Sequence, residues 1–238
     1  MLPRVLKVDL HTHTADDPID RIPYSTIELI DRAAALGFDC LAITLHDRQL
    51  DVDPLVAYAA ERNVVLIPGM ERTVEGRHVL LLNFPQDAVE DVRSFEDVRR
   101  LKQRQEGLVI APHPYFPGPH SLFGLLHRHA DIFDAVEHNA MYTASLDFNR
   151  AAQRWAGSHG KPMVGNSDVH RFEQLGSTYS LVEAERSPSA ICAAVCAGRV
   201  RVVTRPLRWD TAIRVTASIF SSSLLSGPRS PQPVGATV

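Results

Sequence analysis

Short apolar runs alternate with longer helix-like segments from residue 5 to residue 204, and this alternation limits the possible folds more than any other feature. The runs are rich in Val, Ile and Leu, which is typical of buried strands. The segments between them carry helix start and stop signals; one example is Ser25 with Glu28, a predicted capping box whose helix ends at Gly37. Strands that alternate with helices in this way predict parallel βαβ units.

The predicted strands span residues 5–10, 40–44, 64–67, 79–82, 108–111, 133–136, 163–164, 178–182 and 200–204. Seven or so parallel strands, with no Gly-x-Gly-x-x-Gly turn after the first, favour an α/β barrel over an open nucleotide-binding sheet. We expect this barrel to fill residues 1–210 as one domain. Serine, proline and glycine dominate towards the end of the chain, so we expect residues 211–238 to form a disordered tail.

Composition argues against several classes of protein. The formal net charge of −3 shows no basic excess, which speaks against binding to a nucleic-acid duplex or to an anionic membrane surface. No apolar run reaches the roughly 18 residues of a membrane span, and no signal peptide is visible, so we expect a cytoplasmic protein. The arginine-rich residues 199–208 form either a last strand with a charged face, which we favour, or a docking surface.

Two histidines separated by one residue stand at the end of the first predicted strand. In extended backbone His11 and His13 point the same way, with Cα atoms about 6–7 Å apart. That spacing suits two imidazoles on one metal ion, but a pair of surface histidines at a strand end explains it equally well. Recurrence of metal ligands at other strand ends would decide between the two interpretations.

Histidines and carboxylates do recur at the ends of the predicted strands. In a parallel barrel these ends meet at one rim, where metal and substrate sites are built. So many ionisable groups at one rim need compensating cations, and they offer ligands for more than one divalent ion. The residues at these positions are His11, His13, His46, Glu71, His113, Glu137, Asp168 and His170.

Five motifs in the expected order resemble the PHP-domain (polymerase and histidinol phosphatase) phosphoesterases. They are His11-Thr12-His13, Ile43-Thr44-Leu45-His46-Asp47, Pro68-Gly69-Met70-Glu71, Pro112-His113-Pro114 and Asn166-Ser167-Asp168-Val169-His170. The resemblance covers roughly residues 5–205. It implies a distorted seven-stranded (β/α)7 barrel that holds two or three divalent metal ions, commonly Zn, Fe or Mn, at the C-terminal rim of the strands.

The resemblance also implies a ligand set for each ion. The sets are His11, His13, Glu71 and Asp168 for the first ion; Glu71, His78 and His113 for the second; and His46, His170 and an aspartate of the loop after His13 for the third. Asp16 and Asp17 both fit the last position, and we choose Asp17. Many relatives carry an aspartate where this chain has Leu45, so any orienting role of that carboxylate is absent here.

The implied reaction is hydrolysis of a phosphoester by a metal-activated hydroxide in a di- or trinuclear site. We expect a small phosphorylated substrate, either a phosphomonoester or a short nucleotide. His138 and Asp47 are candidates for protonating the leaving group, although His138 would point away from the rim if Glu137 points towards it. The candidates for binding phosphate are Arg72, Arg77 and Arg171, although we favour a solvated surface position for each of them.

Two other functions remain open at this point. An amidohydrolase-like enzyme acting on a C–N bond also uses a His-x-His barrel, but its carboxylated lysine is not apparent among Lys7, Lys102 and Lys161. A non-catalytic, metal-stabilised accessory domain is the other alternative, and a full ligand set disfavours it. The oligomeric state is not readable from the sequence.

Overall fold

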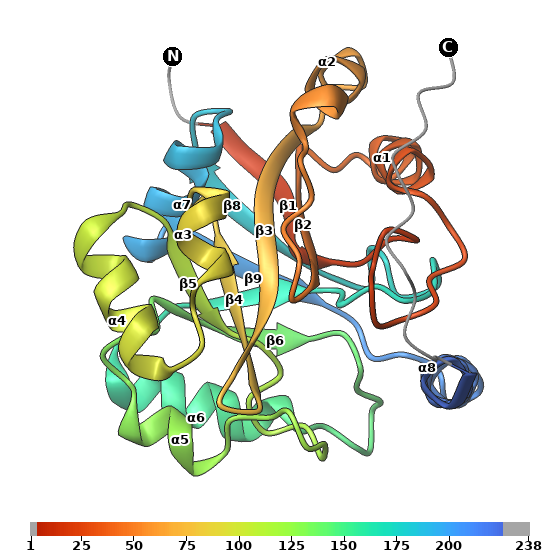
Figure 1. The fold of residues 1–238 in the computed structure, drawn as a ribbon. Helices are drawn as coiled ribbons and strands as arrows, with labels where there is room; N and C mark the ends of the chain where they lie inside the picture. Colours follow the sequence, from red (N-terminus) through yellow and green to blue (C-terminus); the bar gives the residue numbers. More distant parts are fainter. Residues whose placement is uncertain (1–3, 226–238) are drawn as a thin grey trace.

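A mixed nine-stranded sheet forms the centre of the protein and curls until its edge strands lie against each other (Figure 1). The computed structural model describes residues 4–225, with side chains described up to residue 217. Its strands are β1 (Arg4–Thr12), β2 (Cys40–His46), β3 (Val65–Val74), β4 (Arg77–Leu82), β5 (Leu108–Ala111), β6 (Ala135–Asn139), β7 (Met163–Asn166), β8 (Thr178–Ala184) and β9 (Val200–Thr204). The helices are α1 (Thr26–Ala35), α2 (Asp53–Glu61), α3 (Gln86–Glu90), α4 (Phe95–Arg104), α5 (Gly124–Arg128), α6 (Asn149–His159), α7 (Pro188–Cys196) and α8 (Trp209–Leu225).

The predicted α/β barrel class is confirmed, but all nine predicted strands join one sheet, rather than the seven of a (β/α)7 barrel, and the sheet is not wholly parallel. The strand order is β7-β6-β5-β4-β3-β2-β1-β8-β9. Two blocks, β1-β2-β3 and β5-β6-β7, are parallel, whereas β4 and β8 run antiparallel to both of their neighbours. The β3–β4 reversal follows from a two-residue turn in which Glu75 (φ 48°) and Gly76 (φ 78°) both adopt the left-handed conformation that tight hairpins need.

Closure of the barrel depends on a close approach of β7 to β8. A Cβ atom on Gly165 would lie 2.7 Å from the carbonyl oxygen of Tyr179, so a larger residue cannot occupy this position without moving the backbone. The Ser180 hydroxyl accepts a hydrogen bond from Gly165 N (2.8 Å) and donates to Gly165 O (3.1 Å). These contacts join β7, the last strand of the second parallel block, to β8, which pairs with β1.

Helix α1 forms where the sequence predicts a helix, because its cap and its apolar face both favour it. Ser25 caps its first turn, and Glu28 reaches back to the Ser25 backbone, so the predicted capping box is present. The apolar face of the helix buries Leu29 and Ile30 in one cluster with Leu41 of β2. Full burial of each such side chain contributes about 1.5–3 kcal/mol, which fixes the helix on the strand that ends at His46.

Helix α8, dark blue in Figure 1, differs from the expected disordered tail because residues 209–225 are helical. Asp210 in its first turn complements the helix dipole, and Val215 is buried. The remaining tail residues, 226–238, lie outside the described residues, and the domain boundary at residue 210 stays a prediction. Among the described helices, none is both long and apolar enough to cross a membrane.

Candidate metal centre

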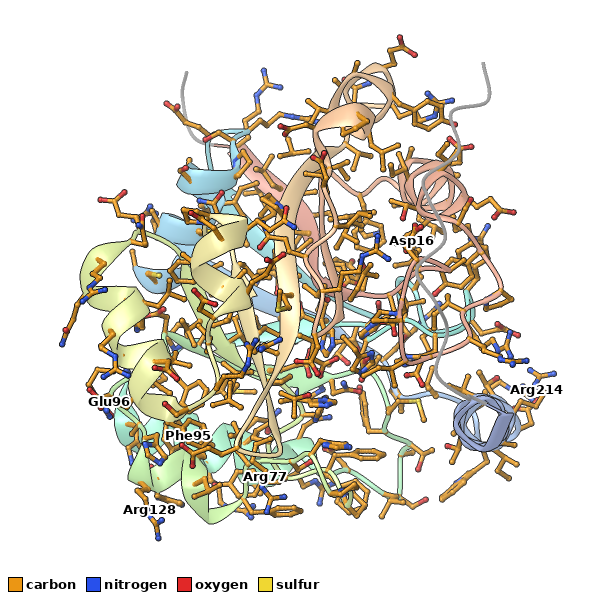
Figure 2. The ribbon with its side chains drawn as sticks, in the orientation of Figure 1. Asp16, Arg77, Phe95, Glu96, Arg128 and Arg214 are labelled. Atoms are coloured by element: carbon orange, nitrogen blue, oxygen red, sulfur yellow. The ribbon has the colours of Figure 1, made fainter. Side chains whose placement is uncertain are left out.

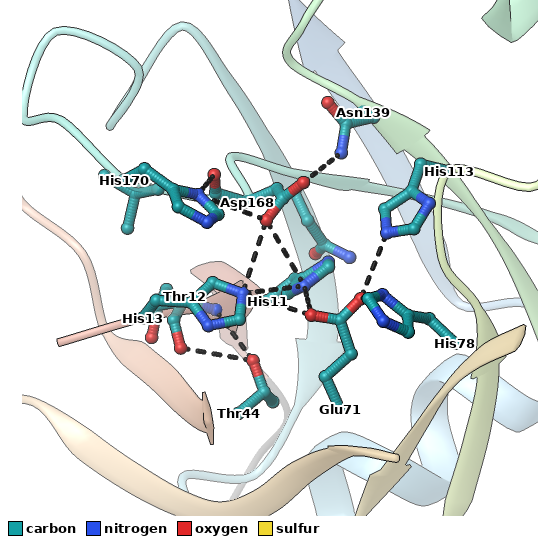
Figure 3. A network of polar contacts seen from close by, with 12 residues as sticks. His11, Thr12, His13, Thr44, Glu71, His78, His113, Asn139, Asp168 and His170 are labelled. Atoms are coloured by element: carbon teal, nitrogen blue, oxygen red, sulfur yellow. Dashed lines mark hydrogen bonds and ion pairs between the residues drawn. The ribbon is translucent and has the colours of Figure 1, made fainter. Parts of the chain in front are cut away.

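Side chains from distant parts of the chain meet at one rim of the barrel (Figure 3). They come from the ends of β1 and β2, from β3, from the start of the reversed strand β4, and from the loops after β5 and β7. Three groups of His, Asp and Glu side chains have ligand atoms within 4.8 Å of one another. The groups are His11, His13, Glu71 and Asp168; His13, Asp17 and His46; and His46, Glu71 and His78.

The first group contains the four side chains expected around the first metal ion. His11 Nε2 lies 3.1 Å from both Glu71 Oε2 and His13 Nε2. His13 Nε2 lies 3.3 Å from Asp168 Oδ1. His11 and His13 are fully buried, so these nitrogen and oxygen atoms converge beneath the surface of the protein.

The two oxygens of Glu71 face different groups of histidines. Oε1 lies 2.7 Å from His78 Nδ1 and 3.0 Å from His113 Nε2. Oε2 lies 3.1 Å from His11 Nε2 and 3.2 Å from His46 Nε2. A carboxylate in this position can bridge two divalent ions, as the resemblance to PHP-domain proteins implies.

The third expected ligand set is divided between two aspartates of the loop after β1. Asp17 Oδ2 lies 3.0 Å from His13 Nδ1 and 2.9 Å from His46 Nδ1. His170 Nε2 instead lies 2.9 Å from Asp20 Oδ2, a residue that we did not select from the sequence. The only sequence feature that indicated Asp20 as a site residue is that it is the third aspartate of the loop after β1.

The surroundings of Asp16 explain why Asp17, and not Asp16, faces the histidines. The Asp16 carboxylate accepts hydrogen bonds from the hydroxyls of Thr14 (3.3 Å) and Thr26 (2.9 Å), so it stabilises the loop rather than facing the histidines. Leu45 is fully buried in an apolar cluster. The Asp17 carboxylate accepts the backbone N–H of the next residue, His46 (3.0 Å).

Backbone strain accompanies the candidate ligands. His113 (φ 28°) and Asp168 (φ 48°) lie in the left-handed region although neither is glycine. Such conformations cost about 1–3 kcal/mol each and persist only where the surrounding structure imposes them, which is common at functional sites.

The buried imidazoles and carboxylates of the cluster shift the pKa values of one another. Burial would lower the pKa of His11, but Asp168, Glu71 and Glu137 outweigh it and raise the pKa well above its ordinary value. Burial would raise the pKa of Glu71, and the surrounding histidines instead hold it well below its ordinary value. Without metal ions, the buried carboxylates are thus compensated by protonated imidazoles. Buried His, Asp and Glu donors in these groups fit divalent ions, which would replace those protons.

A second layer of hydrogen bonds orients the donors. Glu137 Oε1 lies 2.8 Å from His11 Nδ1, and Glu137 Oε2 accepts the backbone N–H of His113 at 2.7 Å. Asn139 Nδ2 donates to Glu137 (3.2 Å) and to Asp168 Oδ2 (3.1 Å). We noted the strand-end position of Glu137 in the sequence but did not select it as a site residue. Its fully buried contact with His11 shows that Glu137 orients this imidazole.

The candidate proton donors are not brought into the ligand cluster. His138 is buried on β6, with Nδ1 3.2 Å from the side-chain amide of Gln153, on the side opposite to Glu137. The Asp47 carboxylate accepts the backbone N–H of Thr73 (2.7 Å) and lies 3.2 Å from Arg72. Both side chains therefore have structural partners of their own.

The three candidate phosphate-binding arginines have different environments. Arg72 is buried and donates to Val92 O at 2.7 Å, so it stabilises the chain after α3. Arg77 lies near the tip of the β3–β4 hairpin and donates to Pro119 O (Figure 2). Arg171 directly follows His170 at the rim, and its backbone N–H donates to Gln174 at 2.9 Å. Arg171 thus remains next to the cluster, whereas Arg72 is withdrawn from it.

Similar proteins change our expectation about the substrate. A 5'-3' exoribonuclease of Haemophilus influenzae is 26% identical over an alignment of 211 residues, and the alignment covers 86% of this chain and 70% of that protein. The fold is similar to that of an Endonuclease Q bound to a 27-mer duplex with an abasic lesion at its active site (TM-score 0.57, 14% identity, 90% of this chain and 67% of that chain). The expected small phosphorylated substrate without nucleic acid is therefore wrong, because net charge says nothing about a local binding surface.

Two comparisons bear on the family. Residues 147–200 match the model of the PHP-associated family. A two-domain protein of Bacteroides vulgatus that contains a predicted PHP-like metal-dependent phosphoesterase has a similar fold, with a TM-score of 0.65 and 20% identity over 92% of this chain and 70% of that chain. The expected resemblance is confirmed, and the order of the rim residues agrees with it. This chain therefore resembles PHP-like proteins in its fold, in its rim residues and in the sequence of residues 147–200.

Proposed function

We propose that this protein is a metal-dependent phosphoesterase that hydrolyses phosphodiester bonds in nucleic-acid strands. The observation that carries the proposal is the position of Glu71, whose two oxygens face two groups of histidines across 2.7–3.2 Å. One carboxylate shared in this way suits two adjacent divalent ions, the arrangement on which many phosphoester-cleaving sites rely.

Three donor groups would hold two or three divalent ions, of which Zn, Mn and Fe suit mixed His and carboxylate ligands. The groups are His11, His13, Glu71 and Asp168; Glu71, His78 and His113; and His46, His170, Asp17 and Asp20. When bound, such ions supply Lewis acidity that polarises a phosphoryl group and makes water a stronger nucleophile at neutral pH.

The side chains themselves define where a substrate approaches. His11, His13 and Glu71 are at most 1% exposed, whereas the side chains of His113 and Asp168 are 14% and 17% exposed. The cluster is therefore open on the side of His113 and Asp168, and a scissile phosphate reaches it from there. Glu137 and Asn139 hold these groups in place beneath that opening.

Local positive charge next to the rim supports a nucleic-acid substrate. Arg205 and Arg208 are exposed in the segment that follows β9, and Arg208 lies 3.1 Å from Asp210 in an exposed ion pair. This segment is joined to the loop after β6 by two hydrogen bonds, from Leu207 N to Tyr142 O (2.9 Å) and between the hydroxyls of Tyr142 and Thr204 (2.8 Å). The arginines thus lie beside the loop that borders the cluster, where they can contact the phosphates of a bound strand.

The two alternative functions receive less support. Lys7 donates to Leu36 O (2.7 Å) and Lys102 pairs with Asp134 (2.6 Å), so neither reaches the ligand cluster as the carboxylated lysine of an amidohydrolase would. A purely accessory domain has no need for a cluster that opens at His113 and Asp168.

The direct test combines metal content with cleavage. The purified protein, loaded separately with Mn²⁺ and Zn²⁺, is assayed on end-labelled single-stranded RNA and DNA oligonucleotides and on p-nitrophenyl phosphate. We expect stoichiometric metal, stepwise oligonucleotide cleavage, and a loss of at least about 1,000-fold in His11→Ala and Asp168→Ala. His159→Ala, an exposed change on α6, is the matched control. Bound metal with no cleavage of either oligonucleotide would refute the proposal.

A further inference from the structure

A pocket adjoins the open side of the metal-ligand cluster. It is lined from the loop after β5 and from the end of β6 to the start of α6 by His113, Pro114, Tyr115, Phe116, Asn139, Met141, Phe148, Asn149 and Ala152. Two of these residues belong to the cluster as well. His113 Nε2 contacts Glu71 (3.0 Å), and the Asn139 side chain donates to Asp168 (3.1 Å). One nucleotide can therefore place its phosphate at the cluster and another of its groups at this pocket.

Aromatic rings form part of the pocket lining. The rings of Phe116 and Phe148 pack edge to face, with centroids 5.5 Å apart and an interplanar angle of 75°. Both residues and Met141 are only half-buried. The enclosed space is about 10 Å³, enough for a single water molecule, so a larger ring would stack against the mouth rather than enter the pocket.

The polar groups of the pocket wall are already bonded to each other. The Asn149 amide oxygen accepts Asn139 N (2.9 Å), and its amide nitrogen donates to Asn139 O (3.0 Å). The Asn139 side-chain oxygen accepts Met141 N at 2.8 Å. These amides are therefore committed to the protein, and the aromatic rings rather than free donors and acceptors are left to contact a base.

We propose that Phe116 and Phe148 form a stacking platform for the nucleobase next to the scissile phosphate, and that the platform accepts any base. This inference rests on the proposed function, because it places the phosphate of the same nucleotide at the metal-ligand cluster. Stacking on aromatic side chains tolerates every base, since each has a π face, and contributes about 1–3 kcal/mol per base. The platform thus favours nucleotides over phosphoesters without a base.

Equilibrium binding tests the platform independently of catalysis. Isothermal titration calorimetry of the Mn²⁺-loaded protein compares AMP with ribose 5-phosphate, which carries the same phosphate and sugar without the base. We expect AMP to bind about 10- to 100-fold more tightly, with CMP and UMP within about 10-fold of AMP. Phe148→Ala should remove most of the difference between AMP and ribose 5-phosphate, and Phe148→Trp should restore it.

Phe123→Ala is the matched control, because Phe123 is 40% exposed in the same loop but does not line the pocket. It should leave the preference for AMP unchanged. Equal affinity for AMP and ribose 5-phosphate in the unmodified protein would overturn the platform, even if oligonucleotides are cleaved. A preference for AMP that survives both Phe116→Ala and Phe148→Ala would also overturn it. Absence of oligonucleotide cleavage refutes the proposed function instead, so the two failures are distinguishable.

Discussion

The Nδ1 atom of His11 lies 2.8 Å from Glu137 Oε1, and both side chains are fully buried. This contact places a proton on Nδ1, between the imidazole and the carboxylate. The Nε2 atom of the same ring then faces Glu71 and Asp168 with its lone pair available once a metal ion replaces the second proton. Glu137 thus fixes both the tautomer and the orientation of a fully buried candidate ligand.

Glu137→Gln should therefore weaken metal binding without unfolding the protein. The amide keeps the size of the carboxylate but loses its charge, so it holds the His11 proton less strongly. We expect metal affinity to fall about 10- to 100-fold, the usual effect of removing such an orienting carboxylate. Competition with a fluorescent chelator measures the affinity, with Glu61→Gln on the exposed end of α2 as the control. An unchanged affinity would show that His11 needs no orienting partner.

Glu71→Gln should have a larger effect, because Glu71 contacts histidines of both groups. We expect the bound metal to fall by at least one ion per chain and oligonucleotide cleavage to fall at least about 1,000-fold. Elemental analysis after gel filtration and the cleavage assay measure the two effects, and circular dichroism confirms the fold. Full metal content in this variant would exclude Glu71 as a bridging ligand.

Metal loading should release protons at pH 7. Burial would lower the pKa of His11 and His13, but neighbouring carboxylates raise both well above the ordinary value of 6.5, so the metal-free protein holds these protons at neutral pH. Metal binding requires neutral imidazoles, so affinity rises with pH until it passes the raised pKa values. Calorimetry in phosphate and in Tris, whose ionisation enthalpies differ, gives the number of protons released. A binding enthalpy independent of the buffer would contradict this prediction.

Asp9→Asn should change how stability depends on pH in the metal-free protein. Burial raises the pKa of Asp9 to about 7 from its ordinary value of 3.8, so the folded state keeps a proton that the unfolded state has lost. The wild type is therefore destabilised, relative to the variant, as the pH rises from 3.8 towards 7. Between pH 5 and pH 8 this amounts to roughly 3 kcal/mol.

Urea unfolding of both proteins at pH 5 and pH 8, with a chelator present, measures this difference. The other titrating groups are common to the two proteins and cancel in the comparison. The amide introduced by Asp9→Asn retains an oxygen that can accept the Ser167 backbone N–H, as the Asp9 carboxylate does at 3.1 Å. A constant difference in the free energy of unfolding at the two pH values would show that Asp9 is ionised in the folded protein at pH 5.

Arg205→Ala and Arg208→Ala should make oligonucleotide binding less dependent on salt. Each arginine that contacts a phosphate displaces counterions, so its removal should lower the slope of log affinity against log salt by about 0.7 for a single strand. Fluorescence anisotropy over a series of KCl concentrations measures the slope. Arg128→Ala, on the exposed face of α5 (Figure 2), is the control. Slopes equal to that of the wild type would place the strand elsewhere.

Some parts of the fold were predictable because they depend on neighbours in sequence. The Ser25–Glu28 capping box needs only four consecutive residues, and it forms as predicted. The reversal of β4 was not predicted as such, although Gly76 indicated a turn. Strand direction depends on the left-handed conformation of Glu75 as well, and the identity of a glutamate does not indicate that conformation.

The sequence by itself determined which residue types stand at the strand ends, and therefore that His11, Glu71 and Asp168 are candidate ligands. Only the tertiary structure decided which atoms face each other: Glu71 between two histidine groups, Asp20 against His170, and Glu137 behind His11. Strand periodicity gives the face on which a side chain lies, but a contact such as that between Asp20 and His170, 150 positions apart, depends on how the barrel closes.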